Sequence, residues 1–140
     1  MEISAPRKRT RVQYPSLMVV EDDPDVGYAV TRWLKSLSIK PVLATTTREA
    51  LELINDVAFI EANLDGLLAD YNLPDATGVS VIKEFVEQFP GIPVAIMTGQ
   101  DDLSLEKWAR ENNVPLFRKP LHMPEVLAWI EKLKPHAVAS

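Results

Sequence analysis

The chain has 140 residues, 46% of them hydrophobic and 25% charged, which is enough to bury the core of one globular domain. Its formal charge of -5 argues against the basic field of a nucleic-acid binder, so we expect no direct nucleic-acid contact. The absence of cysteine excludes disulfides, thiolate metal sites and thiol catalysis. Because no apolar run approaches the roughly 18 residues of a membrane span and no signal peptide is evident, we expect a cytoplasmic protein without membrane contact.

The ends of the chain differ from its centre. Residues 1–15 hold a basic run and prolines without apolar periodicity, which predicts a disordered basic leader. We expect the folded domain over residues 16–134 and a short C-terminal tail over 135–140, with no output domain. Whether the chain acts alone or is one part of a longer protein stays open at this point.

Five short apolar runs predict the strands of a buried parallel sheet, since such strands are apolar on both faces and polar only at their ends. The runs cover residues 17–20, 41–44, 67–69, 93–97 and 114–117. Each is followed by apolar residues at helical spacing. The predicted helix faces are Val26, Val30, Trp33, Leu34 and Leu37; Ala50, Leu53, Ile54 and Val57; Val79, Ile82, Phe85, Val86 and Phe89; Leu105, Trp108 and Ala109; and Val126, Leu127, Ile130 and Leu133.

Local signals mark several helix ends. Asp23 or Asp25, beside Pro24, suits the start of the first helix, where an acidic side chain caps free amides. Thr46 with Glu49 has the spacing of a capping box. The segment 56–65 is poorly patterned and leaves the end of the second helix open.

Strands alternating with helices predict an α/β domain with right-handed crossovers and a parallel sheet covered on both faces. Ligand sites in such sheets form beyond the carboxyl ends of the strands, and polar residues follow four of the five predicted strands. These residues are Glu21, Asp22, Asp70, Thr98 and Lys119.

This set of side chains suits phosphoryl transfer. Carboxylates in close proximity repel one another, and a hard divalent cation held through oxygen, Mg²⁺ or else Mn²⁺, resolves that conflict. Lys119 and Thr98 can bind phosphoryl oxygens. Asp70 can act as the nucleophile and carry the phosphoryl group as an acyl phosphate.

Five motifs in order resemble the receiver domains of two-component response regulators over residues 16–134. They are Val19-Val20-Glu21-Asp22-Asp23-Pro24-Asp25, Ala69-Asp70-Tyr71-Asn72-Leu73-Pro74, Thr77-Gly78, Met97-Thr98-Gly99 and Arg118-Lys119-Pro120. The resemblance implies a flavodoxin-like (βα)5 fold with strand order 2-1-3-4-5. It also implies direct Mg²⁺ ligation by Asp22 and Asp70, water-mediated ligation by Glu21, and a ligand from the Asn72 backbone carbonyl.

In this family the acidic pair directly follows the first strand, which selects Glu21 and Asp22 and leaves Asp23 as a surface or capping acid. The resemblance further implies a cis peptide between Lys119 and Pro120.

By this resemblance, the chain accepts a phosphoryl group on Asp70 from a sensor histidine kinase or a histidine phosphotransfer protein. It then switches protein contacts through Thr98, Lys119 and the face formed by helix 102–112, strand 114–117 and helix 123–134. We expect a monomer or weak dimer, and a signalling switch that catalyses only its own phosphorylation and dephosphorylation.

One position departs from the family pattern. Leu116 stands where receivers commonly carry an aromatic switch residue, and strand alternation predicts that Phe117 points into the core. Leu116 therefore leaves open a receiver that stores or relays phosphate, detached from a hybrid sensor kinase.

Other classes fit less well. A pseudo-receiver that binds partners without phosphorylation usually lacks Asp70, Lys119 or the acidic pair, and all are present. A Mg²⁺-dependent phosphatase would want an acid where Asn72 stands. A flavin or dinucleotide enzyme would want a glycine-rich loop after the first strand, where the chain has acids instead.

Overall fold

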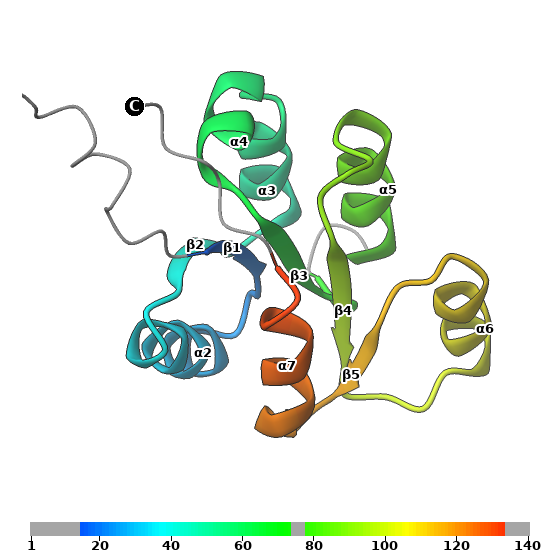
Figure 1. Cartoon of the computed structure of the whole chain (residues 1–140). Helices are drawn as coiled ribbons and strands as arrows, with labels where there is room; N and C mark the ends of the chain where they lie inside the picture. The colour runs from blue at the N-terminus through cyan, green and yellow to red at the C-terminus, as the bar shows by residue number, and fades with distance from the viewer. Residues whose placement is uncertain (1–14, 74–77, 134–140) are drawn as a thin grey trace, which may run out of the picture.

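Five strands form one parallel sheet in the computed structural model, which describes residues 15–73 and 78–133 (Figure 1). The strands are β1 (Ser16–Val20), β2 (Lys40–Ala44), β3 (Gly66–Asp70), β4 (Val94–Thr98) and β5 (Leu116–Arg118). Their order is β2-β1-β3-β4-β5, with every neighbouring pair parallel. This confirms the predicted flavodoxin-like fold. The predicted leader up to residue 14 and the tail 135–140 lie outside the described residues.

Helices cover both faces of the sheet. On one face, α2 (Pro24–Ser36) and α7 (Met123–Ile130) pack over a core that includes Leu17, Val19 and Leu68. On the other, α3 (Thr47–Ile54), α4 (Val57–Asn63), α5 (Gly78–Gln88) and α6 (Leu103–Glu111) pack over a second core. Figure 1 shows α3, α4 and α5 across the sheet from α2 and α7. None of the helices in the described ranges is both long and apolar enough to cross a membrane.

The predicted second helix is in fact two helices. The chain leaves α3 at Ile54, and Asp56 starts α4 by accepting a hydrogen bond from the Phe59 amide at 3.1 Å. Val57 was predicted to belong to the buried face of α3, but it is 45% exposed because the new cap turns the chain before it. The poorly patterned segment therefore contains a short helix that its weak apolar pattern does not predict.

The buried face of α5 also differs slightly from the prediction. Val86 is 39% exposed, whereas Val81, which was not predicted to be buried, is fully inside. The residues against the sheet are Gly78, Val81, Ile82 and Phe85, an i, i+3, i+4, i+7 stripe that leaves Val86 at its edge.

Helix α2 begins at the first of the two predicted caps. The Asp23 carboxylate accepts hydrogen bonds from the Asp25 and Val26 amides at 2.9 and 3.4 Å. At α3, the Thr46 hydroxyl accepts from the Glu49 amide at 3.0 Å, and the Glu49 carboxylate accepts from the Thr45 amide at 2.6 Å. These caps fix where each helix leaves the carboxyl edge of the sheet.

Candidate functional site

The predicted site residues lie at one edge of the sheet, because every strand is parallel and the strands end together. The register pairs Val20 with Ala69 and Asp70 with Met97, so Glu21 leaves β1 beside the end of β3. Asp70 and Thr98 are the last residues of β3 and β4, and Lys119 follows β5 directly.

Three carboxylates cluster at this edge. Glu21, Asp22 and Asp70 each offer an oxygen, and these oxygens lie within 4.8 Å of one another. Glu21 and Asp70 are only 1% and 3% exposed, whereas Asp22 is exposed. An all-oxygen donor set that is buried on one side and open to solvent on the other suits a hard cation such as Mg²⁺.

Lys119 bridges the two buried acids. Its Nζ lies 2.5 Å from Glu21 Oε1 and 3.2 Å from Asp70 Oδ2. The other carboxylate oxygens accept hydrogen bonds from the backbone. Glu21 Oε2 accepts from the Asp23 amide at 3.2 Å, and Asp70 Oδ1 accepts from the Asn72 amide at 3.3 Å. The Lys119–Pro120 peptide is cis, as the family resemblance implied. Both oxygens of Asp70 are thus held in fixed directions.

The surroundings of Glu21 and Lys119 shift the pKa values of these two groups. Burial raises the pKa of Glu21 above its usual value, and the nearby Asp70 charge acts in the same direction, against the hydrogen bonds from Lys119 and the Asp23 amide. Burial alone would lower the pKa of Lys119, but its contacts with Glu21 and Asp70 outweigh this effect and raise it. Lys119 therefore stays charged at neutral pH, while the carboxylates remain under-neutralised.

Gly78 holds the start of α5 against the backbone of Asp70. A Cβ at this position would lie 2.2 Å from the Asp70 carbonyl oxygen, a separation that no side chain tolerates. The Gly78 amide also donates to the Tyr71 carbonyl at 2.9 Å, and the Tyr71 amide donates to Met97 at 2.7 Å. Gly78 appears in a motif of the sequence, but this close approach could not be read there because it joins segments on either side of residues 74–77.

Thr98 lies beside the cluster with its hydroxyl engaged elsewhere. The side chain is buried, and Oγ1 accepts a hydrogen bond from the Gln100 amide at 3.1 Å and lies 3.5 Å from the Gln100 carbonyl oxygen. The backbone carbonyl of Thr98 accepts from the Lys119 amide at 2.7 Å. The structure thus brings Glu21, Asp22, Asp70 and Lys119 together at one edge, and it directs the Thr98 hydroxyl into its own loop.

A family model described as the response regulator receiver domain matches residues 17–131. The chain belongs to this family. It is 34% identical over 133 residues to the DNA-binding transcriptional regulator NtrC of Proteus hauseri, an alignment covering 89% of the chain and 26% of that regulator. It is 27% identical to the transcriptional regulatory protein PrrA of Mycobacterium tuberculosis, covering 89% of the chain and 52% of PrrA. The chain thus spans only about a quarter to a half of these relatives.

Solved receiver structures share the fold. The CheY-like receiver domain protein of Methanospirillum hungatei superimposes with a TM-score of 0.74 at 21% identity, covering 85% of this chain and 92% of that one. The non-phosphorylated receiver domain of HemR from Leptospira biflexa superimposes with a TM-score of 0.73 at 25% identity. This match covers 88% of this chain and 99% of that one.

Leu116 stands at the position where the family resemblance implied an aromatic residue. Leu116 is partly buried and packs against the core that contains Leu105 and Ala109 of α6. Phe117 points into the opposite core, with its ring centroid 6.1 Å from that of Trp129, which confirms the predicted alternation.

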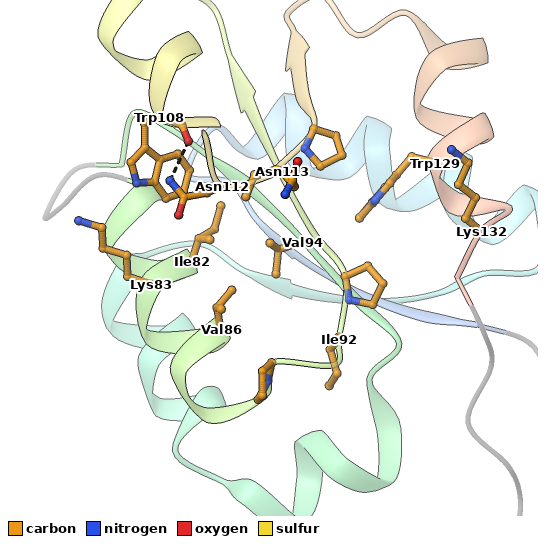
Figure 2. Close-up of a pocket in the computed structure, with 14 residues that line it drawn as sticks. Ile82, Lys83, Val86, Ile92, Val94, Trp108, Asn112, Asn113, Trp129 and Lys132 are labelled. Atoms are coloured by element: carbon orange, nitrogen blue, oxygen red, sulfur yellow. Dashed lines mark hydrogen bonds between the residues drawn. The ribbon is translucent and has the colours of Figure 1, made fainter. Parts of the chain in front are cut away.

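A groove of about 470 Å³ lies at the other edge of the receiver's sheet, where β4 and β5 begin (Figure 2). Pro93 and Pro115, which precede these strands, line it together with Trp108 and Trp129. None of the clustered carboxylates, nor Thr98 or Lys119, is among its lining residues. The groove is therefore separate from the acidic site.

Proposed function

We propose that this receiver accepts a phosphoryl group on Asp70 in a Mg²⁺-dependent reaction with a sensor histidine kinase or a histidine phosphotransfer protein as donor. The observation that carries the proposal is the Lys119 ammonium bridging Glu21 and Asp70 beside the exposed Asp22. Three carboxylates around one lysine leave two negative charges without a partner, and a divalent cation balances them.

The donor set fits a hard divalent cation. Asp22 and Asp70 would bind Mg²⁺ directly, Glu21 largely through water, and the backbone carbonyl of Asn72 would add a further oxygen; Mn²⁺ would be accepted by the same ligands. When bound, the ion neutralises the developing charge on the phosphoryl oxygens. The three carboxylates that lie together at the edge of the sheet support this proposal.

The chain's own residues perform the transfer. An Asp70 carboxylate oxygen attacks phosphorus, the phosphorus–nitrogen bond to the donor histidine breaks, and its electron pair returns to the imidazole. Both oxygens of Asp70 are held before reaction, by Lys119 and by the Asn72 amide, which limits the orientations that the carboxylate can adopt. Lys119 moves part of its interaction from Glu21 to a phosphoryl oxygen.

Phosphorylation would then change the surface. The Thr98 hydroxyl leaves Gln100 and donates to the phosphoryl group, which biases the loop and α6 toward the active arrangement. Changing the ratio of active to inactive conformations from 1:99 to 99:1 takes about 5.5 kcal/mol of differential binding. The output face is formed by α6, β5 and α7, and the partner is a protein. We infer a cytoplasmic monomer or weak dimer that catalyses only its own phosphorylation and dephosphorylation, without direct nucleic-acid or membrane contact.

Leu116 favours a second candidate, a receiver that stores or relays phosphate with a small conformational output. A Leu116→Tyr variant should then show a larger phosphorylation-dependent change in tryptophan fluorescence than the parent protein. Equal changes in the two proteins would count against this candidate.

Incubation with acetyl phosphate and Mg²⁺, read by intact mass, tests the main proposal. We expect one added phosphoryl group in the parent protein, none with chelator, and none in Asp70→Asn. Asp56→Asn is the matched control, because asparagine can still cap α4 and position 56 lies outside the site. Labelling that survives Asp70→Asn would refute the proposal.

A further inference from the structure

Arg118 joins three segments around the switch threonine. Its guanidinium forms an ion pair with Asp101 in the loop between β4 and α6, and its Nη2 lies 2.9 Å from Glu106 Oε2 on α6. In the sheet register, the residue opposite Arg118 is Thr98. One side chain therefore links the end of β5 to both the loop and the helix that follow Thr98.

The loop is held at both ends. At its start, the Thr98 carbonyl accepts from the Lys119 amide at 2.7 Å. At its end, Asp101 is paired with Arg118, and the next residue, Asp102, caps α6 by accepting from the Leu105 amide at 3.0 Å. Between these points the Gln100 amide donates to Thr98 Oγ1 at 3.1 Å. A shift of this closed loop against β5 would carry the Gln100 amide away from the Thr98 hydroxyl.

We propose that Arg118 is a positioning residue that keeps the Thr98 hydroxyl turned toward Gln100 in the unphosphorylated protein. The inference rests on the proposed function, since a phosphoryl group on Asp70 is what draws Thr98 away. Moving the loop toward Asp70 stretches the pair between Arg118 and Asp101. The Arg118 ion pairs thus couple β5 to the loop and to α6. Leu116 on the same strand has no aromatic ring that could make such a link.

The solvent exposure of the paired side chains sets how strongly Arg118 can hold the loop. The side chains of Arg118 and Asp101 are 50% and 86% exposed, so water and salt screen this pair strongly. Glu106 is 31% exposed, and a guanidinium shared by two carboxylates forms a small network, which contributes more than an isolated surface pair. We expect a two- to fivefold effect, about 0.4–1 kcal/mol, that shrinks as salt is added.

The first test measures the dissociation constant of beryllofluoride, a phosphoryl analogue, with Mg²⁺ present. Arg118→Gln should bind it about two- to fivefold more tightly than the parent, because the loop is released. Arg118→Lys should lie in between, since an ammonium lacks the fork that serves two carboxylates. Arg110→Gln is the matched control, an exposed arginine in the last turn of α6 that removes the same charge.

A double-mutant cycle shows whether Arg118 acts through the loop. Asp101→Asn should give part of the increase in beryllofluoride affinity. The double variant that combines Asp101→Asn with Arg118→Gln should bind no more tightly than Arg118→Gln alone. Unchanged or weaker analogue binding in Arg118→Gln, or an equal gain in Arg110→Gln, would overturn the inference.

The second test needs no phosphoryl group. Hydrogen exchange of the Gln100 amide, which donates to Thr98 Oγ1, should be about two- to fivefold faster in Arg118→Gln and unchanged in Arg110→Gln. Unchanged Gln100 exchange in Arg118→Gln refutes the positioning role. If the parent binds no beryllofluoride while Gln100 exchange still responds to Arg118→Gln, the proposed function fails and the positioning role survives.

Discussion

Replacing Gly78 with alanine should damage both the stability and the chemistry of the site. The new Cβ would start 2.2 Å from the Asp70 carbonyl oxygen, whereas ordinary contacts begin at 3.4 Å, so α5 and β3 must separate by about 1 Å. Such overpacking typically costs about 1–3 kcal/mol, and the better helix propensity of alanine offsets up to about 1 kcal/mol of it. We expect a net loss of about 1–2 kcal/mol in the free energy of unfolding.

The same displacement moves Asp70 relative to Lys119 and the other acids. Because a misplacement near 1 Å can cost about a hundredfold in rate, we expect phosphorylation by acetyl phosphate to slow by about tenfold to a hundredfold. Gly91→Ala is the control, since its Cβ would meet nothing within 4 Å and its backbone is not in the left-handed region. The free energy of unfolding of Gly91→Ala should rise by about 0.4–1 kcal/mol, because alanine reduces the entropy of the unfolded chain.

Urea unfolding and the phosphorylation rate of both variants test this reasoning. The two variants should differ by about 2 kcal/mol in unfolding free energy, with similar dependence on urea concentration. If Gly78→Ala were as stable as Gly91→Ala and phosphorylated at the parent rate, the close approach of Gly78 to Asp70 would not constrain the site.

Two further predictions follow from the protonation of the acids. Burial raises the pKa of Glu21, so its value in the folded protein lies above the unfolded value near 4.5. The stability that this group contributes at low pH is therefore lost as the pH rises through the folded-state pKa. Glu21→Gln should therefore raise stability in Mg²⁺-free buffer at neutral pH and weaken Mg²⁺ binding, measured by urea unfolding and calorimetry; lower stability would contradict the pKa direction. Hydrogen bonds from the Thr45 hydroxyl and amide lower the pKa of Glu49, so its contribution is present above about pH 4.5 and lost as pH falls through the folded pKa. A carboxyl titration by NMR should show Glu49 below 4.5, and Thr45→Val should move it upward; a Glu49 value that does not respond to Thr45→Val would contradict the assigned cause.

The sheet and its carboxyl edge were predictable because they depend on local patterns. Apolar runs such as 67–69 end at polar residues, and parallel order then brings Asp70 and Lys119 to one edge whatever the details of the helices. A cap beside Pro24 was likewise predictable, because a carboxylate there satisfies amides within its own turn, and the structure selects Asp23 over Asp25.

Other features depend on distances between remote segments and left no local signal. The contact between Gly78 and the Asp70 carbonyl and the pairing of Arg118 with Asp101 and Glu106 arise only when the strands are assembled. The break before Val57 was missed for a different reason, because Asp56 competes for the backbone within a segment whose apolar pattern is weak.

Chemical trapping shows whether Asp70 is the residue that carries the phosphoryl group. An acyl phosphate is reduced by borohydride to an alcohol, so phosphorylated Asp70 would become homoserine. After treatment with acetyl phosphate and Mg²⁺, peptide mass mapping should find homoserine at position 70, and only when Mg²⁺ was present. Homoserine at another aspartate, or unmodified Asp70 in protein that carries a phosphoryl group, would rule out Asp70 as the acceptor.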